Sequence, residues 1–253
     1  MRIKFLLIFV LFSFICLGQL NERDTLVFKG DLSLTGFYQG GNVETIIFRA
    51  KSNVSFRAYK KWVFKTTNSY VYQEFGKKKA DEDILSLNFL SFNPDKKIYP
   101  ILLGFVSTNF RREINLRTLW GGGLTYKVLD KEKYKLKTSL SSEYEQTEFR
   151  KNTFNIAEFN QNNYINTLRG TLWVNGKYQL FNKKIIFNHE LYFQPSLQQK
   201  NNFRWQADLG LELPLWKFLN FNVNYLHTYE KIVIEKQKQE DKMLTFGFIL
   251  KSY

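Results

Sequence analysis

The sequence predicts an all-β fold, a closed antiparallel transmembrane β-barrel of about 12 strands (range 10–14). The first observation is that apolar and polar residues alternate with a period of two along most of the chain, as in strands with two different faces. The second is that these stretches are longer than the strands of soluble proteins, which average about 5–6 residues. The third is that short and longer connections take turns between them, which is typical of barrels that span a membrane.

The first 18 residues are typical of a signal peptide. A basic start precedes an apolar run over residues 5–17, and Gly18 supplies the small residue that cleavage requires. The run is too short for a comfortable membrane-spanning helix, which needs about 20 apolar residues. We therefore expect residues 1–18 to direct export and residues 19–253 to form one outer-membrane barrel domain.

Composition excludes several classes of protein. A hydrophobic fraction of 44% excludes a disordered chain. The chain has a single cysteine, Cys16, which excludes a disulfide scaffold. Because Cys16 lies in the predicted signal peptide, a lipoprotein acylated at Cys16 is the alternative to cleavage after Gly18. The formal charge of +14 could indicate nucleic-acid binding, but an exported chain with lipid-facing strands does not favour it.

The alternating segments are predicted to be strands because their polar residues recur at every second position, which does not place them on one face of a helix. On a helix, Lys133, Lys135 and Lys137 would spread around the axis, whereas on a strand they share one face. Lipid can surround the apolar faces only if every backbone group is paired, which requires a closed barrel. An even strand number places both termini at the same end, which we expect to be periplasmic. The expected segments are 26–38, 43–58, 61–75, 83–93, 98–111, 115–129, 133–147, 162–179, 184–198, 202–213, 217–231 and 241–253.

The connections and irregularities give more specific expectations. Residues 76–82 are expected to form one of the longer connections. A phase slip between Phe89 and Leu90 predicts a bulge in the segment 83–93. Pro195 predicts that its strand ends early or carries a bulge. The glycines at positions 121 and 123 fall on the polar phase, where they would leave space for a bulky neighbour or permit a sharp bend.

A soluble antiparallel barrel is the alternative fold, with apolar residues inside and charges outside. Such barrels normally need fewer residues than this chain supplies. Their lumen could not hold the apolar faces of a chain with 25 Phe, 14 Tyr and 5 Trp. The two folds differ in which face points inward.

The charged phase of the strands is expected to line the lumen. Its surplus of basic groups would favour anions if a water path exists. Alternatively, the long side chains fill the lumen and stiffen the wall without any conduction. The predicted lumen-lining residues are Arg49, Lys51, Arg57, Arg117, Lys135, Glu143, Glu145, Arg169, Glu190, Arg204, Asp208 and Glu212.

Residues suited to catalysis or metal binding are sparse. The two histidines, His189 and His227, fall on the phase assigned to lipid or to the interface, and no serine lies in a Gly-x-Ser-x-Gly context. No cysteine remains after the predicted cleavage, and the histidines are far apart in sequence, which disfavours a metal site. We therefore expect no catalytic residues, no metal and no cofactor.

Two local motifs resemble those of a known family. Residues 36–42 read Gly-Phe-Tyr-Gln-Gly-Gly-Asn, and the next three read Val-Glu-Thr, where the family usually has Ser or Thr and an acidic residue. Residues 119–126 read Leu-Trp-Gly-Gly-Gly-Leu-Thr-Tyr and follow Arg117 closely. The chain resembles the domain-of-unknown-function 481 (DUF481) family, which contains salt-induced-type outer-membrane proteins of Gram-negative bacteria. The resemblance implies an outer-membrane barrel and supplies no substrate or catalytic residue.

These observations predict a non-enzymatic outer-membrane β-barrel of a Gram-negative envelope, either a small, weakly anion-selective pore or a structural protein. The alternatives are an outer-membrane lipid-modifying enzyme and a soluble periplasmic ligand-binding barrel. Expected partners are outer-membrane lipids and lipopolysaccharide, contacted by the lysine runs 77–79, 96–97 and 183–184. The barrel-assembly machinery is expected to act during biogenesis, and the terminal Tyr253 partly matches its aromatic signal. We expect a monomer.

Overall fold

The computed structural model describes residues 28–40, 44–59, 61–160 and 162–251. The predicted signal peptide and Tyr253 lie outside the described residues, as do residues 41–43 of the first hairpin connection. Within the described part, the only helix is a single 3₁₀ turn, Ala157–Phe159, and no helix is long and apolar enough to cross a membrane.

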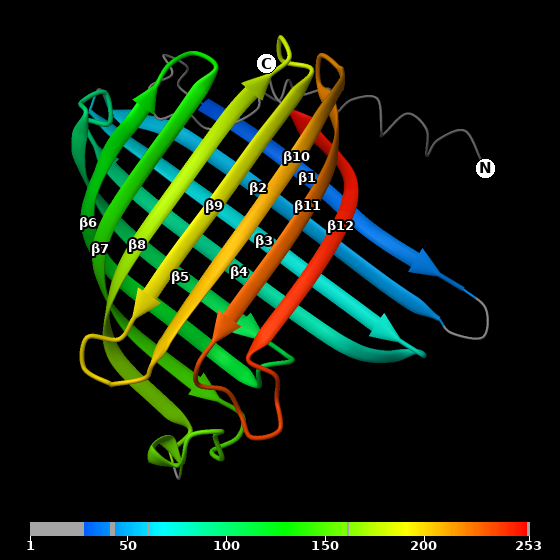
Figure 1. The fold of residues 1–253 in the computed structure, drawn as a ribbon, viewed down its shortest axis with the longest axis vertical. Coiled ribbons are helices and arrows are strands. Elements are labelled where there is room, and N and C mark those ends of the chain that lie inside the picture. Colours follow the sequence, from blue (N-terminus) through cyan, green and yellow to red (C-terminus); the bar gives the residue numbers. More distant parts are fainter. Residues whose placement is uncertain (1–27, 41–43, 60, 161, 252–253) are drawn as a thin grey trace, which may run out of the picture.

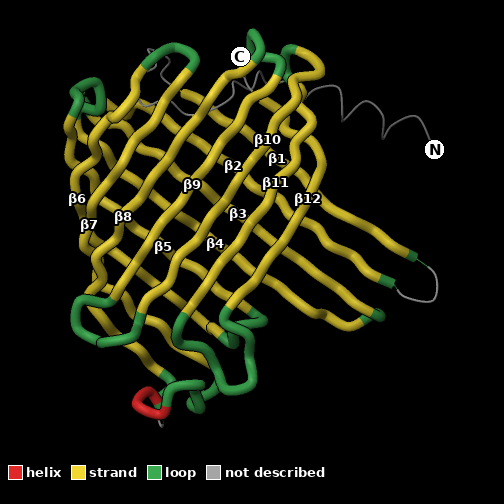
Figure 2. Tube along the Cα trace, in the orientation of Figure 1, coloured by secondary structure: helices red, strands yellow, loops and turns green. Residues whose placement is uncertain are grey.

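The described residues form a closed barrel in which every strand pairs with its neighbours in the sequence and β1 pairs with β12 (Figures 1 and 2). All pairings are antiparallel. The strands are β1 (Phe28–Gln39), β2 (Thr45–Tyr59), β3 (Trp62–Phe75), β4 (Lys78–Phe92), β5 (Ile98–Asn109), β6 (Ile114–Asp130), β7 (Tyr134–Phe149), β8 (Tyr164–Leu180), β9 (Ile185–Pro195), β10 (Phe203–Trp216), β11 (Leu219–Glu230) and β12 (Glu240–Lys251).

The outer face of the barrel is apolar and the inner face is mostly polar. Leu140 on β7 is 67% exposed and Phe246 on β12 is 47% exposed, whereas their neighbours in sequence, Ser141 and Thr245, are buried. In water, a surface of this kind would be strongly unfavourable, but lipid can surround it while the lumen remains polar. This arrangement contradicts the soluble alternative and confirms a transmembrane barrel of twelve strands.

The two ends of the barrel differ. At one end, here called the turn end, β1 begins, β12 ends, and five short turns connect the strands (Figure 1). The opposite end, here called the loop end, carries the longer connections 150–163, 196–202 and 231–239. The periplasmic location of the turn end stays a prediction.

The prediction of a long connection over residues 76–82 is wrong. Gly76 and Lys77 have φ values of +55° and +62° and form a tight turn, so that β4 begins at Lys78. Glycine adopts such a φ without steric cost, which lets the chain reverse within two residues. The alternation was weak over residues 78–82 because they are all charged or small.

The predicted bulge in the segment 83–93 is also absent. Pairing between β3 and β4 is regular from Trp62 opposite Phe92 to Gln73 opposite Asp81. The register shifts beyond that point, because Glu74 pairs with Lys79 and Ala80 is the extra residue. The apparent phase slip arises because β4 carries apolar residues on both faces.

The expectation for Pro195 is confirmed, because β9 ends at this residue, which has no N–H to donate to a further pair.

Gly121 and Gly123 lie on the inner face of β6, and a Cβ atom at either position would collide with the backbone of β7 at Ser142 or Leu140. The glycines therefore allow β6 and β7 to approach closely, and the bend or the space for a bulky neighbour expected there stays a prediction.

Candidate functional site: the polar lumen

A cavity lies inside the barrel and opens at the turn end. Its volume is about 350 Å³, and side chains from ten of the twelve strands line it. Glu132, in the turn between β6 and β7, belongs to this lining and its side chain is 82% exposed, so the cavity reaches solvent there. Six of the predicted lumen residues line it, namely Arg49, Lys51, Lys135, Glu190, Asp208 and Glu212.

Two carboxylates on β10 accept from cations of β2 and β12 and from amides of the adjacent strands β9 and β11. Asp208 accepts from Lys51 at 3.1 Å and from Arg49 at 3.4 Å. Glu212 pairs with Lys251 and accepts from Asn188 at 2.6 Å. Further amides complete these shells, because Asn224 donates to Asp208 and Asn220 to Glu212. The carboxylates on this wall are therefore already neutralised.

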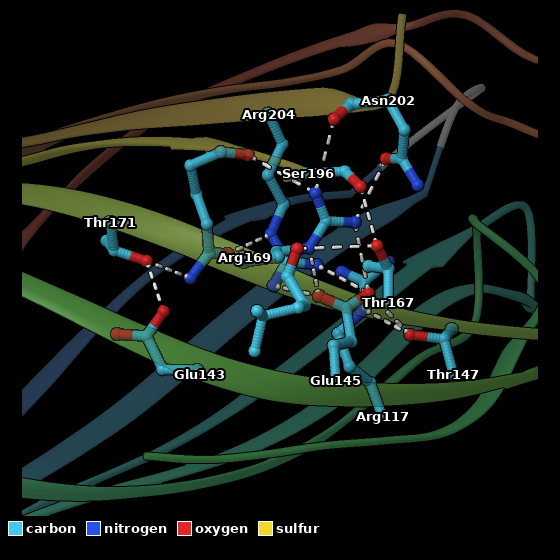
Figure 3. A network of polar contacts seen from close by, with 12 residues as sticks. Arg117, Glu143, Glu145, Thr147, Thr167, Arg169, Thr171, Ser196, Asn202 and Arg204 are labelled. Carbon is cyan, nitrogen blue, oxygen red and sulfur yellow. Dashed lines mark hydrogen bonds and ion pairs between the residues drawn. The ribbon is translucent and has the colours of Figure 1, made fainter. Parts of the chain in front are cut away.

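The loop end of the lumen contains a dense ion-pair cluster, here called the arginine cluster, which comprises Arg117, Glu145, Arg169, Arg204 and Glu230. Figure 3 shows Glu145 among the three arginines. Glu145 is 1% exposed and is shared by three arginines, with Arg204 Nη2 at 2.8 Å from its Oε2. Arg117 forms a two-pronged pair with Glu230, with both N···O distances at 2.8 Å. Only a void of about 10 Å³ remains among these side chains, which leaves no room for a solute.

Polar side chains from the strands anchor this cluster. Thr147 accepts from Arg117 Nε at 3.1 Å, and Gln194 accepts from Arg204 Nε at 2.6 Å. Arg169 donates to Asn202 Oδ1 at 3.0 Å, so the loop after β9 is tied to the same network. Figure 3 shows these groups converging from several strands on one point inside the barrel. Charge-assisted bonds of this kind fix each side chain in one position.

Two further arginines lie in the connection between β5 and β6 at the loop end and pair with carboxylates of β4 and β12. Arg111 pairs with Asp81 at 2.6 Å and with Asp241 at 3.2 Å. Arg112 pairs with Asp241 at 2.8 Å. These contacts link β4, the 110–113 connection and β12 across the mouth of the lumen.

A hydrophobic cluster covers the arginine cluster on the loop side. The connections 150–163 and 231–239 pair through a bridge between Phe154 and Ile234, and the backbone N–H of Asn155 donates to Val233 O at 2.9 Å. The buried residues are Ile114, Phe149, Phe154, Phe159, Ile165, Ile232 and Ile234. The two connections thus form a packed lid with its own small core.

An apolar layer separates the cavity from the arginine cluster on one side of the lumen. Trp173 lies on β8 between Thr171, which belongs to the polar network, and Asn175, which lines the cavity. Its ring contacts Phe89 of β4, with centroids 5.9 Å apart, and Tyr192, at 4.9 Å. The layer comprises Leu85, Leu87, Phe89, Leu103, Phe105, Trp173 and Tyr192.

The remaining predicted residues lie elsewhere. Glu143 is fully buried on the inner face, but it accepts from the hydroxyls of Ser141 and Thr171 and does not line the cavity. Arg57 lies at the rim of the turn end, where it pairs with Asp95 of the 93–97 turn at 3.2 Å. Arg117, Glu145, Arg169 and Arg204 all belong to the arginine cluster.

Two features of the lumen were not predicted from the sequence: Glu230 and the apolar layer. Glu230 lies at the end of β11 on the same phase as the inward asparagines 220, 222 and 224, and continuing that alternation would have identified it. The apolar layer gave no such signal, because inward Leu and Trp residues look like lipid-facing ones.

Both histidines lie on the outer face. His189 pairs in register with Gly176 and stacks on Tyr178 with centroids 5.7 Å apart. The ring centroids of His227 and Trp205 are 4.6 Å apart, and His227 Nε2 lies 3.5 Å from Glu240 Oε2. Among the described residues, no group of three or more His, Cys, Asp or Glu side chains could hold a metal ion.

Comparisons with known proteins agree with this architecture. Residues 32–251 match the model of a family described as a protein of unknown function, DUF481. The NanC porin, solved in a rhombohedral crystal form, superposes with a TM-score of 0.54 at 9% identity, covering 88% of this chain and 100% of that chain. At this identity, the likeness shows the fold alone.

Other solved barrels are more distant. The translocator domain of the autotransporter NalP from Neisseria meningitidis gives a TM-score of 0.44 at 11% identity, covering 92% of this chain and 90% of that chain. The CymD monoaromatic hydrocarbon channel gives a TM-score of 0.41 at 6% identity, covering 91% of this chain and 80% of that chain. A search of curated protein sequences finds no significant match.

Proposed function

Since the chain belongs to the DUF481 family and folds as a transmembrane barrel, we propose that it is a non-enzymatic protein of the Gram-negative outer membrane. Its lumen is a weakly anion-selective channel, and the conformation described above is its closed state. Outer-membrane lipids and lipopolysaccharide surround it, and it acts as a monomer.

The observation that carries this proposal is the asymmetry of the lumen. A cavity of about 350 Å³ opens at the turn end, and it ends at side chains and two loop connections. No separate domain or helix fills the lumen among the described residues. A blockage made of rotatable side chains and loops can open without unfolding the barrel.

The charge of the cavity supports a preference for anions. Eight lysine and arginine side chains line it, against six carboxylates. A ring of charges of one sign in a narrow aqueous path raises the local concentration of the opposite ion. The small excess predicts weak rather than strict selectivity.

Planar-bilayer conductance of the refolded chain tests the proposal, with Glu145→Gln as the informative variant. This change removes the shared anion of the arginine cluster, so we expect rare openings for the wild type and frequent openings for the variant, with a reversal potential shifted toward anions. The matched control is Glu158→Gln, which removes the same charge from an exposed position in the lid. If Glu145→Gln opens no more often than the wild type, the closed channel is ruled out.

A structural envelope role is the second candidate, and the dense arginine cluster favours it. A lumen filled by mutually satisfied charges stiffens the wall and needs no conduction. Silent bilayers for all three proteins would support this role. Envelope fractionation with heat-modifiable migration on a denaturing gel tests the outer-membrane location common to both candidates.

A further inference from the structure

One carboxylate of the lumen cavity differs from the others in its contacts. Six carboxylates line the cavity, and Glu190 of β9 is the one among them that has no hydrogen bond or ion pair with any described residue. Its side chain is half-buried on the cavity wall, so a solute that enters can reach it. The other five carboxylates each contact a lysine, an arginine or an asparagine, and they are Asp31, Asp130, Glu132, Asp208 and Glu212.

The strands beside Glu190 favour a cationic partner for it. Asn175 of β8 lies directly opposite Glu190 on one side, and Asp208 of β10 lies directly opposite it on the other. Asn175 also lines the cavity and has no hydrogen bond with a described residue. Asp208 has the same sign of charge as Glu190, and like charges directly opposite each other destabilise a sheet. A cationic group beside Glu190 and Asn175 would offset this repulsion and could donate to both side chains.

The apolar layer lies next to Glu190 and makes its charge more effective. The next pair in register toward the loop end is Trp173 with Tyr192, whose ring centroids are 4.9 Å apart. Apolar rings screen a charge less than water does, so an opposite charge is attracted more strongly beside them. A solute cation should therefore bind more tightly at Glu190 than at Glu132 in the turn, whose side chain is 82% exposed.

A donor for an anionic group lies on the same part of the cavity wall. Lys51 Nζ lies 3.1 Å from Oδ2 of Asp208, the residue directly opposite Glu190. The Lys51 side chain is 27% exposed, and an ammonium group has three donors. Lys51 can therefore bind an anionic group without leaving Asp208. An acceptor for cations and a donor for anions thus lie close together.

We propose that this part of the cavity binds a small zwitterion, a solute with one ammonium group and one carboxylate group. Glu190 and Asn175 accept from the ammonium group, and Lys51 donates to the carboxylate group. Hydrogen bonds in which one partner is charged are stronger than those between neutral groups. The site deepens the proposed function, on which it rests only for the passage of the solute through the barrel.

The test is a titration of the full chain in detergent micelles with glycine, β-alanine and 4-aminobutyrate, read by calorimetry. These zwitterions hold their two charges at increasing separations, and we expect saturable binding of at least one of them. Methylammonium and acetate, which each carry only one of the two charges, should bind more weakly. Glu190→Gln should weaken binding of the zwitterion by about tenfold or more, as for the loss of a charged hydrogen bond.

Three further variants separate the charge of Glu190 from effects on folding. The matched control Glu132→Gln removes the same charge from the mouth of the same cavity and should bind as the wild type does. Glu190→Asp keeps the charge and should lose less affinity than Glu190→Gln. Lys51→Gln should weaken binding of the zwitterion and leave binding of methylammonium unchanged.

The outcomes that overturn the site are equally specific. They are no saturable binding of any zwitterion, equal losses in Glu190→Gln and Glu132→Gln, no effect of Lys51→Gln, or methylammonium binding as tightly as the zwitterion. Binding in micelles requires no conduction, so a protein that is silent in bilayers and binds the zwitterion refutes the proposed function and keeps the site. A conducting barrel in which Glu190→Gln leaves the affinity unchanged keeps the proposed function and removes the site.

Discussion

Both ends of the lumen carry charged side chains of β6, β7 and β8, yet these side chains are arranged in different ways at the two ends. At the loop end, Glu145 and Glu230 are interleaved with arginines, and the resulting cluster leaves a void of only about 10 Å³. At the turn end, lysines lie directly opposite lysines around a cavity of about 350 Å³. The closed end is thus filled by ion pairs that reach across the lumen, whereas the open end keeps a water-sized space between its charged side chains.

The two ends of the lumen therefore differ in how their charged side chains are satisfied. The arginine cluster satisfies its own hydrogen bonds and needs no external group, so its contribution is to the closed barrel. At the turn end, Lys127 lies opposite Lys137 and Lys135 opposite Lys177, so like charges face each other across the strands. Removing one charge should therefore have opposite effects at the two ends, and the predictions below test this contrast.

The largest effect is expected for Glu145→Gln. Three arginines lose their shared anion inside the barrel, and breaking a buried ion pair costs about 3–5 kcal/mol. Urea unfolding of the refolded protein in lipid vesicles, followed by tryptophan fluorescence, measures this loss. Glu158→Gln should unfold as the wild type does, and a loss below about 1 kcal/mol for Glu145→Gln would mean that the cluster is not stabilising.

Leu87→Ala should have the next largest effect, because it leaves a hole in the apolar layer between the two ends. A buried leucine cut to alanine loses about 2–4 kcal/mol. The same unfolding assay applies, with Leu140→Ala as the lipid-facing control, where lipid fills the space and the loss is smaller. Equal losses at the two positions would show that the layer is not packed.

Lys177→Gln should change stability in the opposite direction. It removes one member of a directly opposed lysine pair, and we expect a gain of about 0.5 kcal/mol in low-salt buffer without phosphate. The gain should shrink as salt screens the repulsion. A destabilisation comparable to that of Glu145→Gln would remove the contrast between the two ends.

Lys183→Gln should have the smallest effect. Its ion pair with Glu132 lies at 3.3 Å on the surface, with both side chains more than half exposed. Exposed pairs of this kind contribute about 0–1 kcal/mol, so the unfolding curve should hardly move. A large shift would indicate that the turn has a structural role that its contacts do not explain.

Much of the barrel could be predicted from the sequence because period-two alternation reports directly which face each residue occupies. The segment predicted over residues 133–147 appears as β7, Tyr134–Phe149, with Lys135, Lys137, Glu143 and Glu145 on its inner face. Prediction failed at β4, where a turn of two residues, Gly76 and Lys77, left a charged strand start that looks like a loop.

The candidate site was harder to predict because a single strand gives the face of a residue and not its height in the barrel. Arg169 and Lys177 occupy the same phase of β8, yet one belongs to the closed cluster and the other to the open cavity. Their separation depends on the register between strands, which the sequence of one strand does not contain. Trp173 between them broke the polar pattern, so the apolar layer was missed.

The junction of the first and last strands sets how deeply the barrel can sink into a bilayer. Pairing between β1 and β12 runs from Asp31 opposite Lys251 only as far as Gly36 opposite Phe246. Beyond that level, β1 continues to Gln39 beside β2 alone and β12 beside β11 alone, and backbone edges of this kind cannot lie in hydrocarbon. The boundary between acyl chains and headgroups at the loop end therefore lies near Gly36, and the parts of β1 and β12 beyond it stand in the aqueous phase.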